Sequence, residues 1–405
     1  MNYYDQLCKA FPDKQELLWL MKYPLHHHLY SYGNHSRISY EKKIGNDAKI
    51  KEFLYFYYAK WYRLGLKKLN NSIVSSANLT VNRSIEEQGF NVFLLNYCLS
   101  YKSYKFLENF KNIDFNRFLS TEFEAKIIEI KEELISIFKS NNIRFLLLAS
   151  DVTPLEKIAI RACQTLEIPT GVFLHGLPAE YDLIDNFSVD YTFVWGESIK
   201  KNYVELGCKK DIIVTGNPNY SGAHPLYGCH DKVVVISFCA GDAYDGSSDL
   251  IADRGLCIQY VYAVEKVLKE YGVTSAILRV HPHENKDWYR KFIDTEFYTM
   301  DTKTLYDTLS DAKFLVGPVS SVLIDTVSHF VPYYSYVITK EVNPHSWNLV
   351  PPFRKQDGLP IAYSEEELLN NLKKENYVKD EQVRSYYAKS FDVSLITEHF
   401  LPEIK

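Results

Sequence analysis

The chain has 405 residues, of which 46% are hydrophobic and 24% charged, and this balance predicts a folded protein of two domains rather than a disordered chain. A formal net charge of −5 with no basic stripe argues against a nucleic-acid partner. The seven cysteines are scattered without a C-x-x-C pair, which favours reduced thiols over disulfides or a zinc site. We find neither a signal-like N-terminus nor an apolar run of ~18 residues, so we expect a cytoplasmic protein.

The first part of the chain, to about residue 140, has mainly helical patterns. Apolar residues recur at helical spacing in 50–61 and 123–138. The segment Val92–Tyr97 between them reads as a strand. We therefore expect helices to dominate this region.

From Asn142 onward, short apolar runs alternate with helical segments. Continuous apolar strands of this kind are typical of parallel sheets covered on both faces. Such sheets bind ligands at the carboxyl ends of their strands. The Pro/Gly/Asn-rich stretch 216–225 is the best domain boundary. The predicted strands are Phe145–Ala149, Thr170–Leu174, Tyr191–Trp195, Ile212–Thr215, Val233–Ser237, Ala276–Val280, Phe314–Val316 and Tyr333–Val337.

Candidate proton-transfer groups of the first half follow two of these strands. Leu174 begins a cluster in which His175, Glu180 or Asp182 could accept the proton of an attacking sugar hydroxyl. Asp151 is another candidate base. The alternative is that 150–154, with its proline, is a plain helix cap.

Candidate phosphate-binding groups lie in the second half. His281-Pro282 follows one strand, and Gly317-Pro ends another before Ser320 and Ser321, which can cap the helix 322–328. A helix start offers free N–H groups, hydroxyls and the positive dipole end, all of which suit a phosphate.

Other residues of this half leave alternatives open. Gly241 lies in a loop of small residues whose amides could cradle phosphate, although it is not a P-loop. Glu284 and Asp325 are either ribose or base ligands, or a surface carboxylate and a helix residue. Arg279 should share the side of His281, or it forms a structural ion pair.

We expect no metal site. The tract His26-His27-His28 has no acidic or cysteine partner nearby, so it reads as incidental. The absence of a D-x-D triplet argues against an enzyme that holds a nucleoside diphosphate sugar through a metal.

The order of these motifs resembles that of bacterial capsule and lipopolysaccharide glycosyltransferases of the GT-B fold, above all those that use CMP-activated keto sugars such as sialic acid, pseudaminic acid or Kdo. The resemblance covers roughly residues 145–340 and rests on His175-Gly176, Trp195-Gly196-Glu197, Thr215-Gly216-Asn217-Pro218, His281-Pro282 and Gly317-Pro-Val-Ser-Ser321.

The resemblance implies an α/β protein in which two Rossmann-like domains face a central cleft. Residues 1–220 would bind the acceptor and carry helical insertions, 221–375 would bind the donor, and 376–405 would form a helical tail crossing back to the first domain. His281, Ser320 and Ser321 would hold the phosphate and ribose of CMP.

The expected function is metal-independent transfer of a CMP-activated keto sugar to a glycan or glycolipid acceptor, with peripheral contact at the inner membrane. The CMP-sugar is a donor substrate, and no cofactor is expected. The expected catalytic candidates are His175, Asp151, Glu180 and Asp182, and the donor-binding ones are His281, Pro282, Ser320, Ser321, Gly317, Gly241 and Glu284.

Three alternatives remain at this point. One is a teichoic-acid-type phosphotransferase with a CDP-polyol donor, although Gly317-Pro318-Val319 stands where that group has Thr-Asp-Tyr. The second is a non-catalytic capsule assembly subunit of GT-B shape. The third is a sugar-nucleotide epimerase, whose two-domain fold is similar. The sequence leaves the sugar, acceptor, linkage, stereochemistry and catalytic base open.

Overall fold

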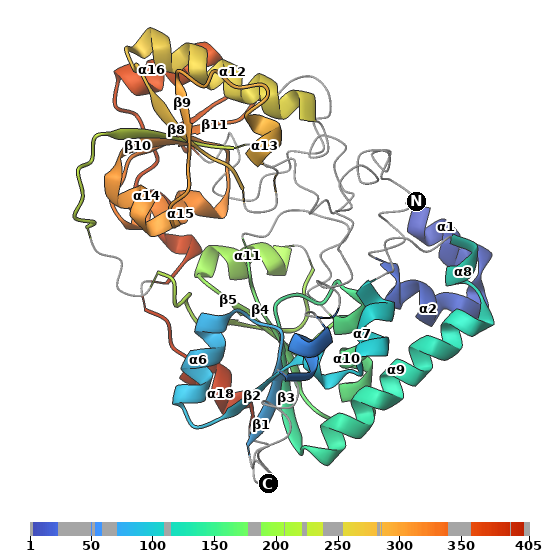
Figure 1. Ribbon diagram of the computed structural model, residues 1–405. Helices are drawn as coiled ribbons and strands as arrows, with labels where there is room; N and C mark the ends of the chain where they lie inside the picture. The colour runs from blue at the N-terminus through green and yellow to red at the C-terminus, as the bar shows by residue number, and fades with distance from the viewer. Residues whose placement is uncertain are drawn as a thin grey trace.

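Two parallel six-stranded sheets, each covered by helices, form the part of the chain that the computed structural model describes (Figure 1). The described residues are 3–22, 50, 53–58, 71–108, 115–176, 188–205, 207–220, 225–237, 254–281, 284, 286–338, 358–388 and 390–400. The α/β fold predicted from the sequence is confirmed.

The first sheet has the strand order β2-β1-β3-β4-β5-β6. Every neighbouring pair is parallel. Its strands are β1 (Ser72–Ser75), β2 (Asn91–Leu94), β3 (Ile143–Leu148), β4 (Thr170–Phe173), β5 (Tyr191–Val194) and β6 (Asp211–Val214). Its helices are α1 (Tyr3–Ala10), α2 (Gln15–Leu20), α6 (Leu79–Glu87), α7 (Tyr101–Glu108), α8 (Phe115–Phe118), α9 (Thr121–Ser140), α10 (Pro154–Thr165) and α11 (Glu197–Glu205).

The second sheet has the order β12-β11-β10-β7-β8-β9 and is also parallel. Its strands are β7 (Lys232–Ile236), β8 (Ala276–Arg279), β9 (Tyr298–Met300), β10 (Ala312–Gly317), β11 (Tyr333–Tyr336) and β12 (Ile361–Ala362). The helices of this half and of the C-terminal segment are α12 (Arg254–Tyr271), α13 (Lys286–Tyr289), α14 (Leu305–Asp311), α15 (Ser321–Ser328), α16 (Glu365–Lys373), α17 (Asp380–Val383) and α18 (Ser394–Thr397).

The eight strands predicted after Asn142 are all present, as β3 to β8, β10 and β11. The helix predicted over 123–138 lies within α9. Of the helix predicted over 50–61, the structure describes residue 50 and residues 53–58, and these are helical. The strand predicted over Val92–Tyr97 is shorter, because Leu95–Cys98 forms a 3₁₀ turn.

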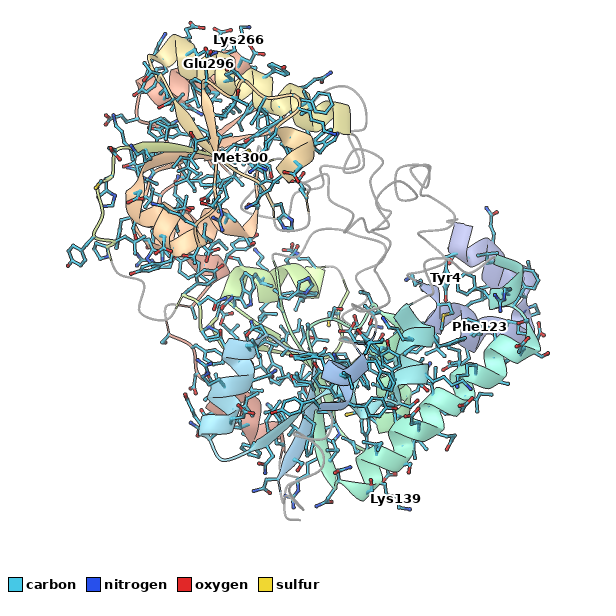
Figure 2. All side chains as sticks on the ribbon, viewed as in Figure 1. Tyr4, Phe123, Lys139, Lys266, Glu296 and Met300 are labelled. Carbon is cyan, nitrogen blue, oxygen red and sulfur yellow. The ribbon has the colours of Figure 1, made fainter. Side chains whose placement is uncertain are left out.

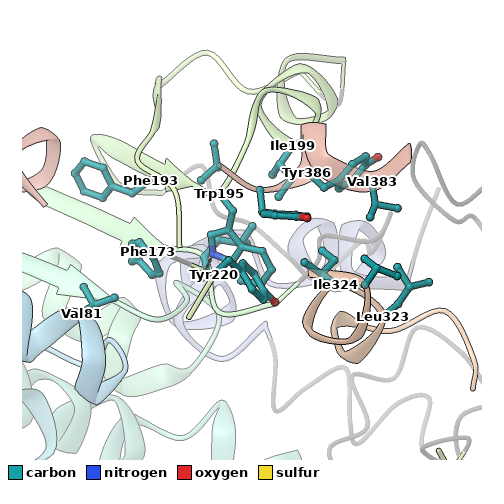
Figure 3. Close-up of a cluster of buried hydrophobic side chains, with 14 of the residues drawn as sticks. Val81, Phe173, Phe193, Trp195, Ile199, Tyr220, Leu323, Ile324, Val383 and Tyr386 are labelled. Carbon is teal, nitrogen blue, oxygen red and sulfur yellow. Dashed lines mark hydrogen bonds between the residues drawn. The ribbon is translucent and has the colours of Figure 1, made fainter. Parts of the chain in front are cut away.

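Apolar side chains fill the space between each sheet and its helices (Figure 2). Phe123 of α9 is 5% exposed, whereas Lys139 and Lys266 lie on the outer surface. A third cluster joins the two halves. It brings Trp195 and Tyr220 together with Ile324 of α15 (Figure 3).

The C-terminal segment returns to the first sheet. The Asp392 amide donates to the Thr215 carbonyl over 2.9 Å, and the ring of Phe400 lies 4.7 Å from that of Phe145. Residues 380–400 therefore contact both halves, since α17 also packs on α15. Within the described residues, no helix combines the length and the apolar character needed to span a membrane.

Candidate functional site

The carboxyl ends of β1, β3 and β4 meet at one edge of the first sheet, because these strands are parallel neighbours. His175, just after β4, is exposed, and its Nδ1 donates to the carbonyl oxygen of Ala149 after β3 over 3.0 Å. A carbonyl only accepts, so Nδ1 carries the proton. In the neutral ring, Nε2 then holds a lone pair and can accept a proton from a ligand.

Asp151, by contrast, is fully buried. Its Oδ2 accepts a hydrogen bond from the Ser188 amide over 3.1 Å. The cap of α10 is Thr153, with Pro154 in the first turn, so the predicted cap exists but Asp151 does not form it. This placement favours a structural role for Asp151. Glu180 and Asp182 lie outside the described residues.

A buried carboxylate that the sequence analysis did not single out lies beside this edge. Glu156 of α10 is 7% exposed and accepts from the hydroxyls of Ser76, Ser150 and Thr153. Burial raises the pKa of its carboxyl, and the three hydroxyls oppose this shift. The signal that could have identified it is the Thr-x-x-Glu spacing of a capping box.

In the second sheet, β7, β8 and β10 bring their carboxyl ends together. The His281 amide donates to Ser237 Oγ over 2.9 Å, and the Glu284 amide donates to the His281 carbonyl over 2.9 Å. Glu284 accepts from the Ser237 hydroxyl and from Tyr289 Oη, the latter at 2.7 Å. These bonds hold the turn after β8 in place, so Glu284 has a structural role there and is not the plain surface carboxylate that was the expected alternative to a ligand.

Arg279 forms a structural ion pair, which was one of its two predicted roles. Its Nη1 lies 2.5 Å from Asp301 Oδ2, and Asp301 is 5% exposed. The same guanidinium donates to the Lys303 carbonyl at 3.2 Å. The strand end is therefore tied to the turn that precedes α14.

Gly317 and Ser320 shape the turn between β10 and α15. A Cβ on Gly317 would lie 2.7 Å from Tyr333 Cζ, so a side chain there would overlap the tyrosine. The Tyr333 hydroxyl donates to the Pro318 carbonyl over 2.6 Å and holds the turn. Gly317 is thus required by packing, whatever ligand the turn binds.

Ser320 is the N-cap residue of α15, as the sequence predicted, but its side chain accepts no capping hydrogen bond. Its Oγ is buried near the Tyr333 hydroxyl, which donates to the Pro318 carbonyl, and among the described residues no group forms a hydrogen bond of good geometry with it. At the starts of α6, α9, α10, α14 and α16, by contrast, the N-cap side chain does accept such a bond. Ser321 is the first residue of the helix.

Asp325 lies one turn into α15, at the junction between the two halves. Burial raises the pKa of its carboxyl to about 7. The pKa of Tyr220 is raised by burial and, to a smaller extent, by the nearby Asp325 charge. Pro282, Gly241 and His26 to His28 lie outside the described residues.

Comparison with known proteins yields matches only among solved structures, since neither a protein-family model nor a curated protein matches the chain. A UDP-N-acetylglucosamine 2-epimerase from Listeria monocytogenes has a TM-score of 0.50 and 16% identity, over 82% of this chain and 97% of that one. The UDP-bound structure of MnaA from S. aureus has a TM-score of 0.50 and 12% identity, over 80% and 94% of the two chains. The chain has the GT-B fold. At these identities the GT-B likeness establishes architecture alone.

One hypothesis of the sequence analysis is wrong. The solved structures that the chain matches include a UDP-N-acetylglucosamine 2-epimerase and the UDP-bound MnaA, so transfer of a CMP-activated keto sugar is not supported. The teichoic-acid-type and non-catalytic alternatives are set aside with it. The motif order that suggested them did not identify the nucleotide.

Proposed function

We propose that this chain is a nucleotide-sugar enzyme that binds a UDP-sugar and inverts its sugar at carbon 2, as the name of the 2-epimerases describes. The observation that carries the proposal is the pair of strand-end sites within one GT-B fold. At one site the imidazole of His175 donates from Nδ1 to a carbonyl, and at the other the N-cap hydroxyl of a helix makes no capping hydrogen bond.

The helix start supports binding of the diphosphate. The first N–H groups of an α-helix have no intrahelical partner, and the dipole there favours negative charge. In α15 the Leu323 amide donates to the Ser320 carbonyl, but the Ser320 hydroxyl caps none of the first amides. The amides of Ser321 and Val322, and the buried hydroxyl after rotation about its Cα–Cβ bond, can donate to phosphate oxygens. Elimination would break the C2–H and C1–O bonds and form a C1=C2 double bond, and re-addition of the nucleotide at carbon 1 and of a proton at carbon 2 would restore both. The same donors would stabilise the charge on the nucleotide while it is detached.

The imidazole supports chemistry on the sugar. Inverting a carbon that carries one hydrogen requires that this hydrogen leave from one face and return to the other, so the enzyme needs groups that accept and donate protons there. His175 is exposed, and its Nδ1–H is committed to Ala149, which leaves Nε2 for a substrate. We assign His175 to one of these proton transfers.

The test is proton NMR of UDP-N-acetylglucosamine incubated with the enzyme in D₂O. We expect loss of the carbon-2 proton signal and formation of the 2-epimer, whereas CMP-sugars remain unchanged. UDP should stabilise the protein against heat more than CMP does. Binding of UDP without deuterium incorporation at carbon 2 would overturn the assignment to epimerisation, and preference for CMP would overturn the UDP assignment.

The variant His175→Asn tests the assigned residue. Its amide can still donate to the Ala149 carbonyl, but it has no basic nitrogen in place of Nε2. We expect deuterium incorporation to fall at least about a hundredfold, while UDP affinity stays within about twofold of wild type. Full activity in this variant would remove His175 from the mechanism.

A further inference from the structure

A continuous set of hydrogen bonds links His175 to a buried carboxylate at the start of α10. His175 Nδ1 donates to the Ala149 carbonyl, and the amide of the same residue, Ala149, donates to Ser76 Oγ over 3.0 Å. Ser76 Oγ in turn donates to Glu156 Oε1 over 3.1 Å. Both ends of the Ala149 residue are thus held, its carbonyl by His175 and its amide by Ser76.

The direction of these bonds follows from the donors present. A serine hydroxyl has one hydrogen, and because Ser76 Oγ accepts from the Ala149 amide, that hydrogen is available for Glu156. Glu156 Oε2 accepts from Ser150 Oγ at 2.8 Å and from Thr153 Oγ1 at 2.9 Å. Every described link therefore has one donor and one acceptor, and the carboxylate at the end accepts throughout.

The capping of α10 does not account for this arrangement. A capping box needs only the reciprocal bonds between Thr153 and Glu156, which are present. The two further hydroxyls, from Ser76 after β1 and Ser150 after β3, tie the helix start to two neighbouring strand ends. The extra bonds converge on the segment that carries Ala149, which is the acceptor of His175.

We propose that Ser76 and Glu156 are positioning residues that fix His175 as its Nδ1–H tautomer and so keep the lone pair on Nε2. The inference rests on the proposed function, because it supplies the proton acceptor that epimerisation needs. Ser76 acts by holding the Ala149 amide, and Glu156 acts by orienting the Ser76 hydroxyl. Neither residue touches the substrate.

The test is ¹⁵N NMR of histidine-labelled full-length protein without substrate, with the His175 signals assigned by their absence from His175→Asn. The two ring nitrogens have distinct shifts in each tautomer. We expect wild type to show the Nδ1–H form, and Ser76→Ala to show a several-fold larger share of the Nε2–H form. Ser76→Thr, which keeps a hydroxyl, should restore the wild-type pattern. Ser84→Ala is the matched control, because Ser84 Oγ donates to the Thr80 carbonyl of α6 on the exposed surface.

The kinetic readout separates positioning from folding. With Ser76→Ala we expect kcat for deuterium incorporation to fall on the order of tenfold with KM nearly unchanged. If Ser76→Ala does not fold, the His175 tautomer is measured in Glu156→Gln and Glu156→Ala instead. Glu156→Gln keeps an acceptor for Thr153, so we expect it to shift the tautomer less than Glu156→Ala does.

The outcomes distinguish the two proposals. An unchanged His175 tautomer in folded Ser76→Ala and Glu156→Ala overturns the positioning role, even where wild type epimerises UDP-N-acetylglucosamine. A shifted tautomer in Ser76→Ala, together with a wild type that leaves UDP-N-acetylglucosamine unchanged, upholds the positioning role and overturns the proposed function.

Discussion

Gly196 lies directly against the backbone of Tyr386: an ideal Cβ on the glycine would be 2.6 Å from the Tyr386 carbonyl carbon and 2.7 Å from the next amide nitrogen. Gly216, with φ of +78°, is pressed in the same way against the carbonyl of Ser390. The glycines of the motifs Trp-Gly-Glu and Thr-Gly-Asn-Pro therefore allow the backbone of the returning C-terminal segment to pack closely against them. Their role in this chain is explained by packing, without a ligand.

The variant Gly196→Ala should destabilise the protein. The added methyl group would meet backbone atoms of 385–387, which cannot move aside as a flexible side chain can. We expect a loss of about 1–3 kcal/mol in the free energy of unfolding, as is usual for overpacking. Urea denaturation measures this loss. Gly176→Ala is the control, because a Cβ there meets nothing within 4 Å and should cost under about 0.5 kcal/mol. Equal stability of the two variants would contradict the packing role of Gly196.

The variant Gly317→Ala should be destabilised through Tyr333. The new methyl group would overlap the tyrosine ring and its hydroxyl, and the ring is fully buried. Removing the hydroxyl in Tyr333→Phe frees part of that space but loses the bond to Pro318. We expect a double-mutant cycle to show a favourable coupling of about 0.5–2 kcal/mol between the two changes. Strict additivity would show that the clash is relieved elsewhere.

The variant Ser320→Ala should leave stability nearly unchanged, unlike other N-cap serines. Its Oγ caps nothing and is buried, so its removal leaves no amide newly exposed. Ser364 is the matched control, since its Oγ accepts from the Glu367 amide at 3.1 Å and starts α16. We expect Ser364→Ala to lose about 1 kcal/mol.

Calorimetry with UDP completes this comparison. Ser320→Ala should bind UDP several-fold more weakly, whereas Ser364→Ala should bind it as wild type does. A stability loss in Ser320→Ala equal to that in Ser364→Ala, with unchanged UDP affinity, would reduce Ser320 to an ordinary cap.

The sequence predicted most of the strands whose two faces are buried by apolar residues. It missed β9 and β12, which are three and two residues long, and β1, whose Ser72 and Ser75 are fully buried although they are polar. Ser75 Oγ makes its hydrogen bonds to residues close in the chain: it donates to Asn82 Oδ1 over 2.7 Å and accepts from the Ala77 amide over 3.0 Å. Hydrophobic pattern cannot reveal a strand whose polar groups are paired in this way, and Ser76 was missed with it.

Candidate site residues could be placed at a strand end only where the strand itself was recognisable. His175 and Ser320 follow apolar runs, so their positions could be inferred. The partners of Arg279 and Glu284 could not, because Asp301 and Ser237 meet them through the order of the strands in the sheet. The nucleotide could not be predicted either, since no residue pattern in the chain identifies a base.

The variant Asp325→Asn should gain stability over wild type as the pH rises. Burial raises the folded-state pKa of this carboxyl to about 7, above its ordinary value of 3.8. Between these values the folded protein binds the extra proton, so wild-type stability falls with increasing pH. Above pH 7 both states are ionised and the fall stops. The asparagine variant has no carboxyl group at this position, so its stability lacks this dependence on pH.

We therefore expect the difference in unfolding free energy between Asp325→Asn and wild type to widen by roughly 1.4 kcal/mol for each pH unit from 5 to 7, then level off. Urea denaturation at pH 5, 6, 7 and 8 measures it. Asp287→Asn is the control for the replacement of an exposed carboxylate, since the Asp287 side chain is exposed beside Arg290. A flat profile for Asp325→Asn would mean that water reaches the carboxylate at the junction, and that the contact between α15 and Tyr220 is looser in solution than this packing implies.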